Sequence, residues 1–131
     1  MKRTFCLLCI LMTVLCSVNA QTIVAPEGKY GVYCKVYGVS YLQGKGSLAA
    51  KVDVGRVESK YDDSEYIVEN GKKVRFNSMM DILDYMAKRG WHLHSTYMEQ
   101  DGSNRGGLIY LMVKFVTDDS QKIEGLELAA E

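Results

Sequence analysis

The stretch NSMMDILDYMAKRGWHLH, residues 77–94, contains a helix start, an apolar stripe, a helix stop and the beginning of a strand. Asn77 or Ser78 can accept a hydrogen bond from a free amide of the first helical turn, and Asp81 lies where the positive end of the helix dipole favours a carboxylate. Gly90 can take the left-handed conformation that ends a helix. Between these signals, apolar residues recur at helical spacing, namely Met79, Ile82, Leu83 and Met86. The stretch therefore predicts one short amphipathic helix.

Trp91 lies one residue beyond the helix stop, and we expect its indole to fold back on the last apolar turn. From this residue on, the pattern changes from helical to alternating, which predicts a strand. Strict alternation would place on one face Trp91, Leu93, Ser95 and Tyr97, and on the other face His92, His94, Thr96 and Met98. One of these two faces is expected to be mostly core.

Other segments also carry strand patterns. Residues 29–39 alternate, residues 48–59 form a second strand, and residues 108–116 are the most apolar strand in the chain. Asn70-Gly71 is a dipeptide suited to a tight turn, and it predicts a small ribbon of residues 66–68 against 73–76.

This order of elements predicts an α+β domain with two layers. We expect an antiparallel β-sheet of about four main strands, a small extra hairpin, and one helix packed on one face of the sheet.

The N-terminal segment differs from the rest of the chain. Lys2 and Arg3 precede an apolar run of eleven residues, and small residues follow up to Ala20, a pattern typical of a secretory signal peptide. The apolar run is shorter than the roughly 20 residues that span a bilayer. We therefore expect a signal peptide over residues 1–20, a single domain over 21–116 and a frayed, polar tail over 117–131. The product would be periplasmic or secreted, with no stable membrane span after cleavage.

Charge and cysteine content restrict the function further. Removing residues 1–20 takes away two of the 16 bases and none of the 16 acids, so the remaining chain is slightly acidic. Nucleic acid, which selects basic surfaces, is therefore an unexpected partner. Of the 4 cysteines only Cys34 lies outside the signal peptide, which rules out an internal disulfide after cleavage. We expect Cys34 to be a buried thiol on its strand.

The segment FNSMMDILDYMAKRGWHLHSTYM, followed by LIYLMVKF, resembles small exported bacterial proteins of unknown function. In those proteins a helix that starts with Asn-Ser-Met runs into Gly-Trp and then a strand. The segment also looks like a broader group of small α+β domains of unknown function. His92 departs from that pattern, which prefers glutamate there. The resemblance implies a shape and a compartment, and no activity.

Two residues form a candidate metal site. His92 and His94 are the only histidines, and two positions apart on a strand they would point to the same side. Such a pair can hold two positions of a zinc or copper ion, with Glu99 or Asp101 as further ligands. The plain alternative is a solvated or stacked histidine pair, and no cofactor is expected.

Catalytic patterns are weak. No Gly-x-Ser-x-Gly elbow occurs, and Ser95 is next to His94 in sequence although side chains of neighbouring residues diverge on a strand. A small hydrolase with an unrecognised site is kept as one alternative to a binding protein.

Tyrosines suggest a partner surface. Tyr33 and Tyr37 share one strand face, which lies open if the helix covers the other, and Tyr41 and Leu42 are apolar residues in a glycine-rich loop. Aromatic surfaces suit sugar rings or a partner chain. The leading hypothesis is therefore a noncatalytic exported domain that binds a protein or a glycan of the envelope or the host. The sequence carries no information on the oligomeric state.

Overall fold

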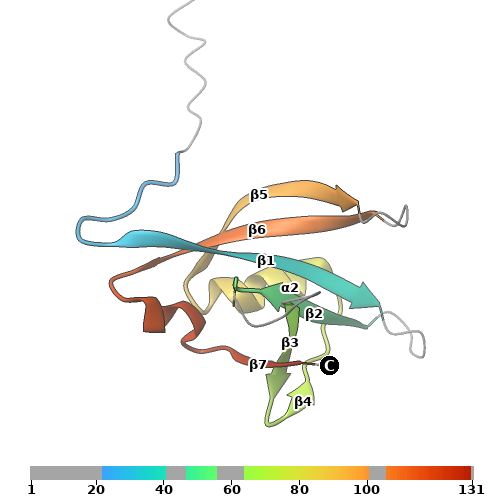
Figure 1. The fold of residues 1–131 in the computed structure, drawn as a ribbon. Coiled ribbons are helices and arrows are strands. Elements are labelled where there is room, and N and C mark those ends of the chain that lie inside the picture. The colour runs from blue at the N-terminus through green and yellow to red at the C-terminus, as the bar shows by residue number, and fades with distance from the viewer. Residues whose placement is uncertain (1–21, 41–46, 56–63, 101–105, 131) are drawn as a thin grey trace, which may run out of the picture.

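The computed structural model describes residues 22–40, 47–55, 64–100 and 106–130. One antiparallel sheet of seven strands dominates this part of the chain (Figure 1). The strand order is β4-β3-β2-β1-β6-β5, and β7 pairs with β3. The strands are β1 (Tyr30–Ser40), β2 (Leu48–Asp53), β3 (Ser64–Glu69), β4 (Lys72–Lys73), β5 (Trp91–Gln100), β6 (Gly106–Val116) and β7 (Glu127–Ala129). The helices are α2 (Met79–Ala87) and the 3-10 helix η1 (Asp119–Ile123).

Helix α2 begins and ends where the sequence predicted. Ser78 Oγ accepts from the Asp81 amide at 3.2 Å, and the Asp81 carboxylate accepts in return from the Asn77 amide at 3.1 Å. The first bond satisfies an amide that the first helical turn leaves without a partner, and the second holds the residue that precedes the N-cap. At the other end Gly90 has φ +87° and donates to the Ala87 carbonyl. Both predicted helix signals are confirmed.

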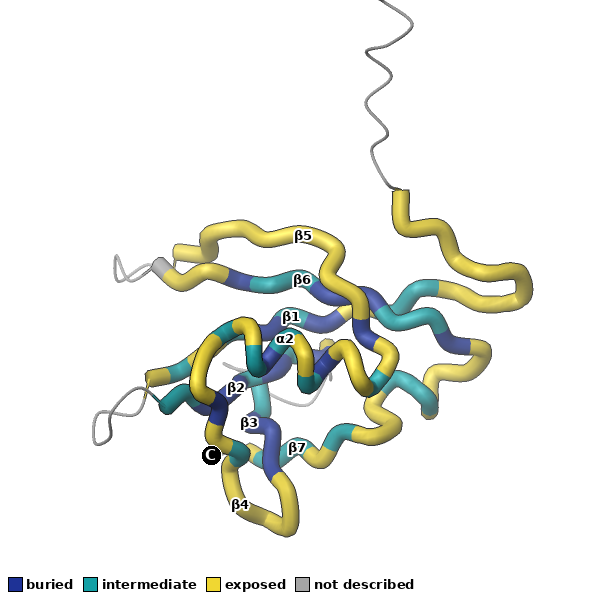
Figure 2. Tube along the Cα trace, turned by 180° about the vertical axis from the view of Figure 1, so that it is seen from behind, coloured by how far each residue is buried: buried dark blue, intermediate teal, exposed yellow. Residues whose placement is uncertain are grey.

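The core lies between α2 and one face of the sheet. Ile82 and Met86 of α2 are buried against strand residues that include Cys34, Val36 and Val52. Gly38 of β1 lies under the helix, since a Cβ there would come within 3.3 Å of Met79 Sδ. Figure 2 shows the helix in front of the buried strands, and we call the sheet face beneath it the α2 face.

Trp91 fills the space at the end of the helix. Its side chain has 0% exposure and belongs to the same cluster as Ile82 and Met86, which confirms the predicted packing of the indole. Cys34 is 2% exposed, as expected for an inward thiol.

The predicted fold class, an α+β domain with about four main strands, was wrong about the sheet, which has more strands than predicted. The sequence predicts about four main strands and a separate small hairpin, whereas one sheet contains seven strands and the described residues hold a single short α-helix. The ribbon β3–β4 belongs to this sheet because β3 pairs with β2, and because Leu48 and Phe76 exchange two backbone hydrogen bonds of 2.8 and 2.9 Å. The domain is therefore mostly antiparallel β-sheet.

The segment expected to form a frayed tail contributes to this difference. This segment contains η1 and β7, and β7 pairs with β3 through Leu128 opposite Ile67. The Glu127 carboxylate accepts from the amides of Asn70 and Gly71, both at 3.0 Å, and so binds the turn between β3 and β4. These contacts order an acidic segment that has no periodicity of its own.

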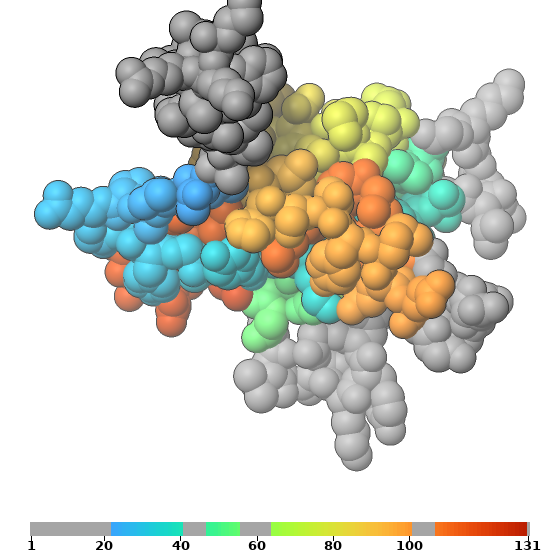
Figure 3. Space-filling model, turned by 90° about the horizontal axis from the view of Figure 1, so that it is seen from above, coloured from blue at the N-terminus to red at the C-terminus, as the bar shows by residue number. Residues whose placement is uncertain are grey.

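Strand β5 forms one edge of the sheet and contains a β-bulge. Leu93 lies opposite Met112 and Ser95 lies opposite Leu111, so His94 is an extra residue without a partner across the ladder. Nine of the ten β5 residues are exposed, and Figure 3 shows the strand lying across the outer surface of the molecule.

The bulge overturns the predicted alternation along β5. Cross-strand partners share a sheet face. Thr96 and Met98, which face Tyr110 and Leu108, lie on the α2 face with Trp91 and Leu93. Ser95, Tyr97 and Glu99 lie on the opposite face with His92, because His94 shifts the alternation by one position.

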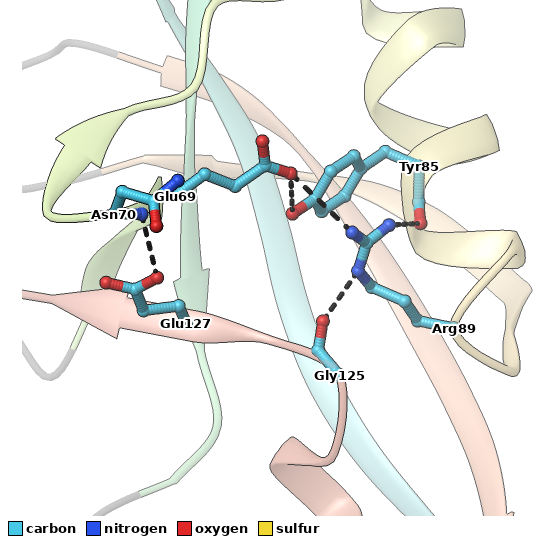
Figure 4. Close-up of polar contacts among 6 residues, drawn as sticks. All are labelled: Glu69, Asn70, Tyr85, Arg89, Gly125 and Glu127. Carbon is cyan, nitrogen blue, oxygen red and sulfur yellow. Dashed lines mark hydrogen bonds and ion pairs between the residues drawn. The ribbon is translucent and has the colours of Figure 1, made fainter.

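A polar cluster joins α2, β3 and the C-terminal segment (Figure 4). The Arg89 guanidinium stacks on the Tyr85 ring at 3.4 Å and donates from Nε to the Gly125 carbonyl at 2.6 Å. Tyr85 Oη donates to Glu69 Oε1 at 3.0 Å, and Arg89 Nη2 lies 3.7 Å from the same oxygen. Each of these groups bonds another part of the fold, so the cluster is a structural connection.

Candidate functional site

We call the sheet face opposite α2 the open face. Side chains cover only part of it. Above β2, β3 and β7, Tyr66 is buried with Ala49 and Val68, and Val39 and Ala129 pack against them. Lys51 and Lys73 lie over the Tyr66 ring, at 5.0 and 3.5 Å from its centroid. This half of the open face is therefore a second, smaller core.

The other half of the open face, above β1, β6 and β5, carries exposed rings. Tyr33 on β1 is 48% exposed and Tyr97 on β5 is 38% exposed. The rings on this half form what we call the aromatic patch: Tyr33, His92, His94, Tyr97 and Phe115.

Ring contacts join four residues of the patch in two pairs. The His94 imidazole meets the Tyr33 ring edge to face, with centroids 5.7 Å apart. His92 packs against Phe115 at 6.2 Å in a tilted arrangement. Beneath them Val113 is buried, opposite both Tyr33 and His92 in the ladder. Residues from three strands therefore form a fixed surface, because their positions are set by the ladder of the sheet.

One ion pair borders the patch. Lys35 Nζ donates to Glu99 Oε1 at 3.0 Å across β1 and β5, and this bond raises the pKa of Lys35. Both side chains are partly exposed, so the pair is screened by water and fixes geometry more than it stabilises.

The bulge also brings Ser95 and His94 together. His94 Nδ1 lies 3.2 Å from Ser95 Oγ, whereas a regular strand would make these side chains diverge, as the sequence predicts. Within the described residues no carboxylate bonds the other imidazole nitrogen, which a serine–histidine–carboxylate arrangement requires.

The described residues add no third ligand to the candidate metal site of His92 and His94. Among the described residues no group of three or more His, Cys, Asp and Glu side chains could hold a metal ion. Glu99, one expected ligand, accepts from Lys35, and Asp101 lies outside the described residues. Metal binding by His92 and His94 stays a prediction of the sequence.

The proposed partner residues have different environments. Tyr33 is exposed, but Tyr37 is half-buried and its hydroxyl shares a 2.6 Å hydrogen bond with Ser64 Oγ. Tyr41 and Leu42 lie outside the described residues. The sequence pattern does not place Tyr97 on the same face as Tyr33, since only the bulge puts it there.

Two hollows lie near the sheet. The first, of about 210 Å³, is lined by Tyr33, Cys34, Lys35, Asp53, Gly55 and Leu111. Burial raises the pKa of the Cys34 thiol to about 12, so the thiol is protonated at neutral pH and is a poor nucleophile.

The second hollow, of about 480 Å³, lies between η1 and the sheet. Its polar side chains bond elsewhere: Asp119 accepts from Tyr30, Ser120 donates to Asp118, and Lys122 donates to the Val54 carbonyl. The bonds of Asp119 and Lys122 therefore hold η1 on the sheet, and the bond of Ser120 caps η1.

No protein-family model, curated protein or solved structure matches this chain. The resemblance to small exported proteins therefore stays an expectation from the sequence. Among the helices of the described residues, none has the length and apolar character needed to cross a bilayer.

Proposed function

We propose that this chain is a noncatalytic exported domain that binds a protein or a glycan through the aromatic patch. The observation that carries the proposal is the exposed Tyr33 ring, held edge to face by His94 on a rigid three-strand surface. Export rests on the signal-like pattern of residues 1–20.

The chemistry of the patch supports a binding role. Tyrosine and histidine rings supply apolar contact area together with hydrogen-bonding groups at their rims, a combination common in protein interfaces and against sugar rings. The adjoining Lys35–Glu99 pair adds a donor and an acceptor at the border. The ladder fixes the backbone, and the Tyr33–His94 and His92–Phe115 contacts restrain these four rings, so less conformational entropy is lost when a partner binds.

A noncatalytic role is supported by what the polar groups do. Ser78 caps α2, and Ser120 donates to the exposed Asp118 carboxylate. The bonds from Ser120 lower the pKa of Asp118, which makes this carboxylate a weak general base. Ser95 and His94 lie on an exposed strand edge, whereas acyl transfer needs a water-excluding site with donors for the developing oxyanion.

The test compares two single substitutions in binding to immobilised glycans and to envelope proteins of the cells that produce the chain. Tyr33→Ala removes the central ring of the patch, and Met80→Ala removes an exposed apolar side chain of α2 on the other side of the sheet. We expect Tyr33→Ala to weaken binding by roughly tenfold or more, as for a central interface ring. Met80→Ala should leave binding unchanged.

The glycan and protein arms identify which class of partner the patch takes. Equal binding by wild type and Tyr33→Ala to every bound probe would overturn the proposal, provided that circular dichroism shows both to be folded.

A further inference from the structure

The outer edge of β5 has no partner among the described strands. β5 pairs only with β6, and every residue after Trp91 is exposed. Along such an edge, backbone amides and carbonyls point to solvent and can pair with another strand. Figure 3 looks onto this edge, with the atoms of β5 lying across the surface.

The segment from Ser95 to Gln100 is built like a strand that pairs. It follows the bulge, so its side chains alternate regularly, and it contains neither proline nor lysine, which often protect free edges. Its one charge, Glu99, is engaged by Lys35 of the same chain. Apolar side chains flank the edge on both faces, with Tyr97 on the open face and Met98, 63% exposed, on the α2 face.

We propose that two copies of this chain pair antiparallel along β5, about a two-fold axis at Tyr97, and join their sheets into one. In this register Tyr97 lies opposite the partner's Tyr97, Thr96 opposite the partner's Met98, and Ser95 opposite the partner's Glu99. Each opposed pair shares a sheet face, as antiparallel pairing requires.

Two requirements select this register: opposed side chains must share a sheet face, and like charges must stay apart. An axis between two residues would oppose side chains of different faces. An axis at Thr96 would set His94 of the bulge opposite the partner's Met98, near the centre of the ladder, whereas the axis at Tyr97 leaves His94 at the end, opposite the partner's Gln100. An axis at Met98 would make the two Glu99 carboxylates diagonal neighbours, about 7–8 Å apart. With the axis at Tyr97 they are four positions apart, about 13 Å along the strand, and each faces a serine hydroxyl.

The inference does not depend on the proposed binding function. An axis perpendicular to the sheet keeps both open faces on the same side, so pairing would place two aromatic patches on one continuous surface. Failure of pairing would leave the single patch as it is.

The test measures the mass of the protein in solution by sedimentation equilibrium, after expression of the full sequence. We expect a monomer–dimer equilibrium. Tyr97→Lys should weaken the dimer at least about tenfold, because two ammonium groups would be opposed at the axis. Tyr33→Lys is the matched control, since it makes the same change on the same face but away from the edge, and it should leave the equilibrium unchanged.

A second variant tests the register directly. Opposed Cα atoms in an antiparallel pair are about 4.5–5.5 Å apart, which suits a disulfide. Tyr97→Cys should therefore form an intermolecular disulfide through residue 97 on oxidation, identified by mass spectrometry of the linked peptides, and Tyr33→Cys should not do so through residue 33.

Three results would overturn the proposal: a wild-type monomer at every concentration, a dimer that Tyr97→Lys leaves intact, or a dimer lost equally in Tyr33→Lys. A monomer that instead pairs with an added strand-forming peptide would show that the edge takes a different chain.

Discussion

At the scale of single residues, Trp91 connects the helix to the sheet. Its indole is fully buried beside Ile82 and Met86, and Lys114 Nζ lies 6.0 Å from its ring. The indole Nε1 is buried and has no hydrogen-bond partner among the described residues. Trp91 therefore stabilises the fold through packing. Its contribution to the free energy of unfolding depends on the apolar area that it removes from water.

Replacing Trp91 measures this packing. We expect Trp91→Ala to lower the free energy of unfolding by about 3–5 kcal/mol, because it leaves a large cavity at the end of α2. Tyr33→Ala, on an exposed ring, should change it by less than about 1 kcal/mol. Urea unfolding followed by circular dichroism gives both values. Similar losses in the two variants would mean that the indole is not the main packing element at this end of the helix.

At the scale of elements, the sequence predicted best where the signals are local. Ser78, Asp81 and Gly90 define the ends of α2 through bonds within a few residues. The order of β7 depends on long-range contacts instead: Glu127 bonds a turn 56 residues away. No pattern within residues 117–131 indicates that contact, so the tail was predicted to be frayed and the strand count was too low.

The site shows the same limit. The open position of Tyr33 followed from alternation within β1, but its neighbours on β5 did not. A regular alternation runs through residues 91–98 in the sequence, and nothing in it reveals that His94 is an extra residue. The bulge depends on how β5 aligns with β6, which is a tertiary property.

Deleting His94 tests this description of β5. The deletion should restore an unbroken alternation and keep Tyr97 and Glu99 on the open face, so the protein should fold. Deleting Tyr97 instead should turn Met98 to the open face and separate Glu99 from Lys35, with a larger loss of stability. Thermal unfolding of both variants measures the difference. A His94 deletion that is the less stable of the two would contradict the assigned register.

At the scale of the whole molecule, helices cover one face of the sheet, and the other face is partly exposed to solvent. α2 and η1 close the α2 face, whereas part of the open face carries exposed rings. Two adjacent residues of β1 differ in exposure for this reason: Tyr33 lies on the open face, and Cys34 lies in the core. Both proposals, a partner on the aromatic patch and a second copy at β5, require this arrangement.

Thiol labelling at positions 33 and 34 tests it most directly. The wild type offers Cys34, and the double variant Tyr33→Cys/Cys34→Ala offers a thiol one residue earlier; peptide mass spectrometry separates these sites from Cys6, Cys9 and Cys16. We predict that position 33 reacts at least about 100-fold faster than position 34, whose exposure needs local unfolding. Equal rates in the folded protein, or faster reaction at position 34, would contradict the assignment of the two faces.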